Sequence, residues 1–379
     1  MPNAFSRFTQ SYQQPPQDVE WVKQQVGKHF PFYEVKFAQD AILFYCKIDE
    51  QNLEDLFNDL RQHLSEKHYL PFLRHEGGEY ILYITHKPVR KSKPLWVNIV
   101  LLIATIITTV LTGSLLSMGY SDIQSLPNIS QLFNPTHLFN GLLYFSLPLM
   151  AILFIHEMGH YYYSIRHGLK TSFPYFIPIP PILPGFNIGT FGALISSNDP
   201  MPNKKALFDI GLSGPIAGFC VAVPVTIIGI LTSNIVPISG LQSGDTVLGI
   251  SLLFYLLQSV LVTIPPGFTL DLNAIAFAGW IGLLITSINL LPAGQLDGGH
   301  IFRAALGEKQ KYVSWVAVFI MIFTGWWFFA FIIILMLGMS HPPPLNDYSP
   351  LDTKRMILFL LAVFMLILCF IPFPIYAVP

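Results

Sequence analysis

The chain has 379 residues, of which 52% are hydrophobic and only 11% are charged. A soluble globular protein has about 25% charged residues, so this composition excludes an ordinary soluble enzyme and predicts a polytopic protein of the lipid bilayer. The formal net charge of −1 argues against a nucleic-acid partner. The three cysteines form no CxxC pair and indicate no disulfide framework.

Residues 1–92 differ from the rest of the chain because they are polar and rich in glutamate. The alternation and spacing of their apolar residues predict a small α/β domain. The expected elements are one or two strands over 35–48, an amphipathic helix over 49–66, and a hairpin of 69–74 and 80–85 around Gly77 and Gly78. Because this region contains no catalytic motif, we interpret it as a cytoplasmic accessory domain.

Residues 93–379 predict a membrane-embedded, all-α domain of about six transmembrane helices, with its core at about 140–310. The expected spans are 95–118, 142–165, 206–231, 273–291, 313–339 and 356–376. The basic residues Lys87, Arg90, Lys91 and Lys93 precede the first span. Positive charge beside a first span marks the cytoplasmic side, so the N-terminal domain is expected there.

The apolar run 247–264 is a further candidate span, near the lower limit of length. If it crossed, Asp297 would lie on the outer side, away from the histidines described below. We therefore expect this run to form an external or re-entrant helix. Under this topology Lys354 and Arg355 fall on the outer side, which weakly conflicts with the positive-inside rule.

The segment 171–205 is rich in proline and glycine and too broken for a spanning helix. Non-helical backbone at membrane depth is tolerated only against protein or a watery cavity. We expect a membrane-associated loop beside the active site, in which 189–196 could form strands. An ordinary surface loop is the alternative interpretation.

The sequence His156-Glu157-Met158-Gly159-His160 is an HExxH motif inside an apolar segment. Residues four apart share one face of a helix, so His156 and His160 can bind one metal ion with Glu157 beside it as a candidate general base. Ionisable residues are costly in hydrocarbon and indicate a functional site. The alternative, buried histidines with purely structural hydrogen bonds, requires several coincidences here.

A catalytic zinc site usually has three protein ligands and one open position, so a third ligand is needed. Asp297 is the best candidate, because it follows Pro292 and Gly294 at the end of an apolar segment, where the broken helix could turn it toward the metal. It could instead cap the following helix. Asp209 and Asp199 are weaker candidates, and the dipole of its own helix favours a structural role for Asp209.

Together, HExxH in one membrane helix and NxxPxxxxDG in a later one resemble the site-2 protease family of intramembrane zinc metalloproteases. The stretches Phe191–Ile195, Ala206–Gly211, Gly214–Gly218 and Leu296–His300 also resemble the surroundings of that family's active site. His341-Pro-Pro-Pro-Leu-Asn-Asp is similar to a segment of the bacterial and plastid-type branch. The loop 171–205 is too short for the PDZ domain that many bacterial members carry.

The resemblance implies that His156, His160 and Asp297 bind one zinc ion and that Glu157 activates water. It also implies that Asn289 positions the substrate or the developing oxyanion, and that Gly214 and Gly218 allow close helix packing. The expected function is an endopeptidase that cleaves a transmembrane segment of a membrane-anchored protein. A strand within 189–196 could hold the unwound substrate by β-addition.

Two other interpretations remain open from the sequence. A non-catalytic homologue could bind membrane helices as a chaperone or scaffold, although such homologues would lose Glu157 or a ligand. A metal-ion transporter would be expected to place more polar residues along its other spans. The bacterial character of the motifs favours an inner or plasma membrane, with a plastid membrane as the alternative.

Overall fold

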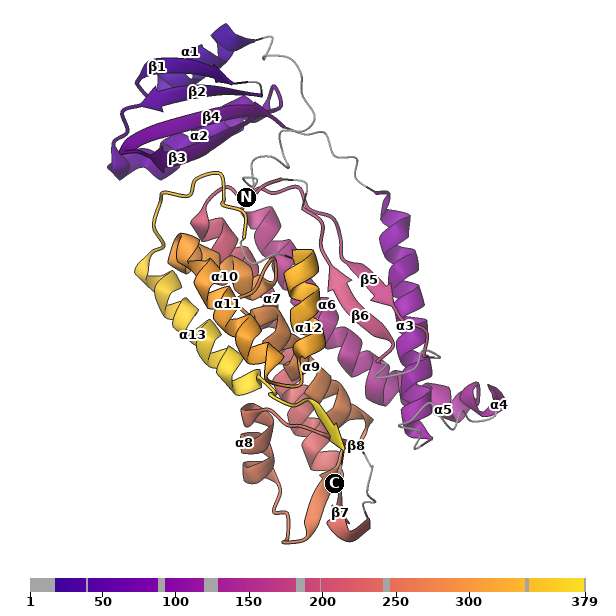
Figure 1. Ribbon diagram of the computed structural model, residues 1–379. Helices are drawn as coiled ribbons and strands as arrows, with labels where there is room; N and C mark the ends of the chain where they lie inside the picture. Colours follow the sequence, from indigo (N-terminus) through magenta and orange to yellow (C-terminus); the bar gives the residue numbers. More distant parts are fainter. Residues whose placement is uncertain are drawn as a thin grey trace.

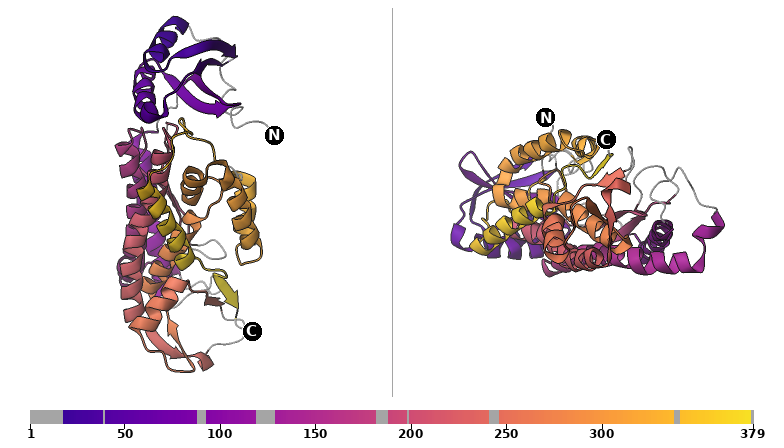
Figure 2. Two further views of the ribbon diagram at one scale, coloured as in Figure 1. Left: turned by 90° about the vertical axis from the view of Figure 1, so that its left-hand side faces the viewer. Right: turned by 90° about the horizontal axis from the view of Figure 1, so that it is seen from below.

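The computed structural model describes residues 18–38, 40–87, 93–118, 129–181, 188–197, 199–240, 246–337 and 341–377. The predicted basic cluster before the first span lies partly outside these residues, at Arg90 and Lys91. The N-terminal domain sits at one end of an elongated helical part, and short strand pairs lie at the other end (Figures 1 and 2).

The N-terminal domain is a four-stranded antiparallel sheet with two helices. Its sheet has the order β1-β2-β4-β3. The elements are α1 (Val19–His29), β1 (Phe32–Ala38), β2 (Ala41–Cys46), a 3-10 turn (Glu50–Asn52), α2 (Leu53–Ser65), β3 (Tyr69–Glu76) and β4 (Glu79–His86). The predicted strands, helix and hairpin are confirmed, and α1 is an additional helix that the sequence analysis did not predict.

The core of this domain explains why α2 forms where it does. Leu53, Phe57, Leu60 and Leu64 recur every three to four residues and are all buried, as a helix that packs one face on a sheet requires. At the β3–β4 turn, Gly77 and Gly78 have φ of 61° and 86°. Only glycine adopts such angles without steric cost, so the hairpin turn follows directly from these two residues.

Among the described residues, three helical stretches are long and apolar enough to cross a membrane. They are α3 (Leu95–Ser117), the stretch Pro135–Arg166, and α7 (Lys204–Thr232). The second consists of α5 (Pro135–Asn140), a π-helical stretch (Gly141–Ser146) and α6 (Leu147–Arg166), and α4 (Ile129–Leu132) precedes it. At 1.5 Å per residue, α3 is about 35 Å long and exceeds the hydrocarbon thickness of about 30 Å.

The expected fifth span over 313–339 is wrong, because the structure divides it. The segment forms α11 (Gln310–Ile322), α12 (Trp327–Ile332) and a π-helical stretch (Ile333–Leu337), with α11 and α12 in contact as a helical hairpin. At the bend, the Gly325 N–H donates to the Pro372 carbonyl instead of continuing a helix. An apolar run read by hydropathy alone does not reveal such a reversal.

The run 247–264 contains only one short helix, α8 (Leu252–Leu261). Ten residues rise about 15 Å, half the hydrocarbon thickness, so α8 is too short to cross, as expected. Strands β8 (Thr246–Leu248) and β10 (Ile375–Ala377) pair near it, as do β7 (Asn234–Pro237) and β9 (Phe268–Asp271). These pairs lie at the end of the molecule opposite the N-terminal domain (Figure 1).

The segment 171–205 contains a β-hairpin, β5 (Tyr175–Pro178) and β6 (Thr190–Leu194), so the expected strands within 189–196 are confirmed. The hairpin lies beside α3 and α6 (Figure 1). Asn98 of α3 donates to the carbonyls of Phe173 and Pro174, and the Thr108 hydroxyl donates to that of Gly189. These bonds satisfy backbone carbonyls of this non-helical segment with side chains of α3.

The segment 341–349, which we call the strap, joins the N-terminal domain to the helical part. Leu345 is 1% exposed and is buried in the core of the N-terminal domain. The Leu73 N–H of β3 donates to the Leu345 carbonyl at 2.8 Å. Asp347 of the strap pairs with Arg303 of α10 (Asp297–Leu306). The strap therefore lies between the N-terminal domain and α10.

This arrangement corrects the expected position of Lys354 and Arg355. They begin α13 (Thr353–Cys369), directly after the strap, and Arg355 donates to Asp209 near the start of α7. Both basic residues therefore lie at the end that faces the N-terminal domain. The physical reason is the α11–α12 hairpin, which returns the chain to the end where it began.

Candidate metal centre

The two motif histidines lie one turn apart on α6 and are buried. Their Nε2 atoms are 3.1 Å apart, and their rings meet edge to face. The i, i+4 spacing thus brings both imidazoles to one point, as the sequence predicts.

Asp297 reaches the same point from a different part of the chain. Helix α9 (Ala274–Leu290) ends, the chain turns through Gly294 with φ of 54°, and Asp297 begins α10. One carboxylate oxygen, Oδ2, lies 3.3 Å from His156 Nε2 and 3.1 Å from His160 Nε2. The carboxylate faces the two imidazoles, and the three side chains form one cluster of potential metal ligands.

The hydrogen bonds of His160 show what this cluster requires. Its Nδ1 lies 2.6 Å from the Ile210 carbonyl oxygen, which can only accept, so Nδ1 carries a proton. In the neutral imidazole the lone pair of Nε2 then faces Asp297 Oδ2, which is also an acceptor. This contact is favourable with a cation between the two atoms, which is either a second proton or a metal ion.

The separations also match those of a metal site. Ligand atoms about 2.0–2.1 Å from a tetrahedral zinc ion are about 3.3 Å apart, and the observed separations are 3.1 to 3.3 Å. Two imidazoles and one carboxylate with one open position form a typical catalytic zinc set. The residues present at this centre therefore fit one zinc ion.

The other two predicted site residues lie beside this cluster. The Asn289 side-chain amide, near the end of α9, has its Nδ2 3.2 Å from His156 Nε2. Glu157 is buried and directly follows the ligand candidate His156 on α6. The structure thus brings together all five residues that the sequence singled out.

Helix α7 packs against the two histidines at two of its glycines. A methyl group at Gly214 would lie 2.1 Å from His160 Nε2, and one at Gly218 would lie 3.1 Å from His156 Nδ1. The close helix packing expected at these glycines is present, and its function here is to leave room for the imidazoles.

The weaker third-ligand candidates have other partners. Asp209 accepts from Arg355 and from His167, which agrees with the structural role favoured for it. Asp209 thus links α7 to the end of α6 and to α13. Asp199 is paired with Lys87, which directly follows β4.

Three residues around α10 were not assigned to the site from the sequence, namely His300 and Arg303 of α10 and His341 of the strap. His300, one turn after Asp297, packs its ring 4.3 Å from that of His341 in the strap. Arg303, one further turn along, is buried and pairs with Asp347. The run His341–Asp347 was the available signal, because such a proline-rich segment between apolar helices suggests an ordered contact.

Part of the chain is similar to known metalloproteases. Residues 144–327 match the family model described as Peptidase family M50. The chain is 29% identical over 244 residues to "Probable zinc metalloprotease EGY1, chloroplastic" of Oryza sativa subsp. japonica, covering 59% of this chain and 39% of that protein. It is 27% identical over 408 residues to the protein of the same name from Arabidopsis thaliana, covering 94% and 71%.

A third relative, "Probable zinc metalloprotease EGY2, chloroplastic" of Arabidopsis thaliana, is 28% identical over 240 residues, which cover 60% of this chain and 41% of that protein. The chain thus spans less than half of the rice EGY1 protein and of this EGY2 protein. No solved structure matches the chain.

Proposed function

We propose that this chain, whose residues 144–327 match the model of Peptidase family M50, is a zinc-dependent intramembrane endopeptidase of the site-2 protease family. Its proposed substrate is a transmembrane segment of a membrane-anchored protein. The observation that carries the proposal is the convergence of His156, His160 and Asp297 on one point inside an apolar helical domain.

The five residues have distinct proposed roles. His156, His160 and Asp297 would hold the zinc ion, which supplies Lewis-acid chemistry when bound. Glu157 takes the proton of the attacking water and later passes it to the leaving amine. Asn289 lies beside His156, where its N–H groups can donate to the oxyanion that develops on the scissile carbonyl.

The β5–β6 hairpin supports a proposal for how the substrate is held. A transmembrane helix protects its own backbone and must be unwound locally before it can be cut. Phe191 and Leu194 of β6 are exposed, and β6 contacts α6, so an extended segment added to this strand would lie near the metal centre.

Proline at Leu194 tests this role, since it removes a backbone donor from β6. Leu194→Ala is the matched control, because it shortens the side chain and keeps the N–H group. We expect slower cleavage in Leu194→Pro alone, at unchanged zinc content. Wild-type cleavage by a folded Leu194→Pro variant would refute the proposal.

We propose that residues 1–92 form the cytoplasmic domain and that 93–379 form the membrane domain. The helices α3, 135–166, α7, α9 and α13 would cross the bilayer, and the α11–α12 hairpin would enter and return, giving five crossings instead of six. The pairing of β10 with β8 supports this topology, because it places the end of α13 beside the segment between α7 and α9. The proposed location is a bacterial inner membrane or, as in the relatives above, a plastid membrane.

The deciding experiment measures zinc content and cleavage together, on purified protein in detergent with a single-span model substrate. We expect one zinc ion at this centre in wild type and in Glu157→Gln, loss of that ion in Asp297→Ala, and cleavage by wild type alone. Zinc without cleavage of any single-span substrate would instead favour a non-catalytic scaffold. If the metal-replete wild-type protein held no zinc at this centre, the proposed protease activity would be refuted.

A further inference from the structure

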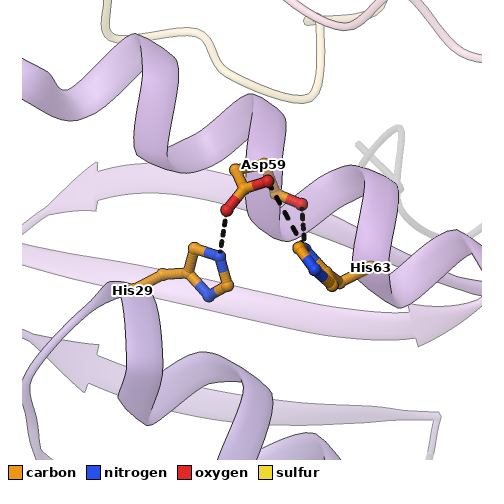
Figure 3. A group of neighbouring side chains, drawn as sticks. All are labelled: His29, Asp59 and His63. Carbon is orange, nitrogen blue, oxygen red and sulfur yellow. Dashed lines mark hydrogen bonds and ion pairs between the residues drawn. The ribbon is translucent and has the colours of Figure 1, made fainter.

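A second cluster of metal-ligating side chains lies in the N-terminal domain, far along the chain from the centre on α6. His29 is the last residue of α1, and Asp59 and His63 lie one turn apart on α2. Figure 3 shows the two imidazoles on either side of the Asp59 carboxylate. The three side chains offer ligand atoms within 4.8 Å of one another.

The hydrogen bonds of His29 place its second ring nitrogen against the Asp59 carboxylate. Its Nδ1 lies 2.8 Å from the Gln25 carbonyl oxygen, which can only accept, so Nδ1 carries the proton. Its Nε2 lies 2.8 Å from Asp59 Oδ2. A neutral imidazole therefore points a lone pair at a carboxylate, and this contact requires a cation, which is either a second proton on His29 or a metal ion.

The position of His63 favours a metal ion over a second proton on His29. His63 Nδ1 lies 2.9 Å from the Asp59 carbonyl oxygen and 3.5 Å from Asp59 Oδ1, so a second imidazole faces the same carboxylate. A backbone carbonyl bound to the second ring nitrogen is the usual support of a metal-ligating histidine. His29 has this support, and His63 supplies a second imidazole, which an ion pair of His29 with Asp59 does not need.

We propose that His29, Asp59 and His63 bind one divalent transition-metal ion, such as Zn²⁺. Two imidazoles and a carboxylate suit such an ion better than Ca²⁺ or Mg²⁺, which prefer oxygen ligands. His29 is anchored, with 7% of its side chain exposed, and Asp59 and His63 are 56% and 46% exposed. The exposed pair can close on the ion by side-chain rotation, with water at the remaining position.

The ion would connect the end of α1 to the middle of α2. In the described residues these two helices share an apolar core with the sheet, and the cluster adds a link between them at the surface. Because metal binding stabilises the folded state that presents the ligands, the ion would stabilise the accessory domain. The inference does not depend on the proposed protease activity.

The test counts zinc per chain in the full-length protein in detergent, stripped with a chelator and re-equilibrated at one buffered free-zinc concentration. We expect His63→Ala to bind one ion fewer than wild type and to bind zinc at the N-terminal site at least tenfold more weakly. The matched control is His68→Asn, which removes an exposed histidine outside the cluster. Asparagine tolerates the φ of 61° at this position, so we expect wild-type zinc content.

Two variants separate this site from the centre on α6. Asp297→Ala should keep the N-terminal ion, and adding His63→Ala to it should remove that ion. Equal zinc content in wild type and His63→Ala would overturn the proposal and leave His29 and Asp59 as a simple ion pair. An equal loss in His68→Asn would overturn it as well, because the zinc would then be bound adventitiously.

Discussion

Alanine at Gly214 is expected to remove the metal from the α6–α10 centre. The new Cβ would lie 2.1 Å from His160 Nε2 and 2.4 Å from its Cδ2, whereas non-bonded atoms are best separated by about 3.5–4.0 Å. The imidazole must therefore move by more than about 1 Å, or α7 must retreat from α6 by a similar amount. Either movement breaks the hydrogen bond between His160 and Ile210.

This displacement is large compared with what a metal site tolerates. Metal–ligand distances in proteins vary by only about 0.2 Å around their ideal values, so a shift of that size removes His160 from the ligand set. Overpacking also costs about 1–3 kcal/mol of stability. We expect Gly214→Ala to lose its zinc at this centre and to cleave a single-span substrate at least about 100-fold more slowly.

Gly218→Ala is the matched control, one turn further along the same face of α7. Its Cβ would lie 3.1 Å from His156 Nδ1, a clash that a shift of a few tenths of an ångström relieves. We expect this variant to keep the zinc ion and most of its activity. Both variants are checked for zinc content, cleavage rate and thermal unfolding. Wild-type zinc affinity and cleavage in a folded Gly214→Ala variant would refute the reasoning, and equal losses in both variants would assign the effect to general helix packing.

Two further predictions concern the N-terminal domain. Leu345→Ala removes a buried side chain at a cost of about 2–5 kcal/mol of stability. The Leu73 amide donates to the Leu345 carbonyl, so its hydrogen should exchange with solvent about 30-fold faster or more. Unchanged exchange in β3 would show that the strap is not anchored there. Burial raises the pKa of the Cys46 thiol to about 12, so the thiol stays protonated until the pH approaches that value. It should therefore resist a thiol reagent at pH 8 in the folded protein and react after unfolding, as mass spectrometry of the labelled peptide can show; rapid labelling of the folded protein would contradict its burial.

The sequence predicted local structure well where the pattern was periodic. The apolar spacing over 53–64 gave α2, and Gly77 and Gly78 gave the β3–β4 turn. It missed α1, although Val19, Val22 and Val26 already have helical spacing, because the polar residues between them weakened the pattern. Periodicity also failed at 313–339, where the apolar run is continuous. The reversal is marked by tertiary contacts, in which Gly325 and Trp326 donate to the carbonyls of Pro372 and Ile371.

The sequence by itself determined the chemistry of the candidate site. His156 and His160 meet because four residues along a helix return to the same face, and this needs no partner. The third ligand is different, because Asp297, Asp209 and Asp199 are all acidic residues near helix ends. Only the tertiary structure placed Asp297 at the imidazoles and gave the other two aspartates basic partners, since a contact across 137 residues depends on how the helices pack.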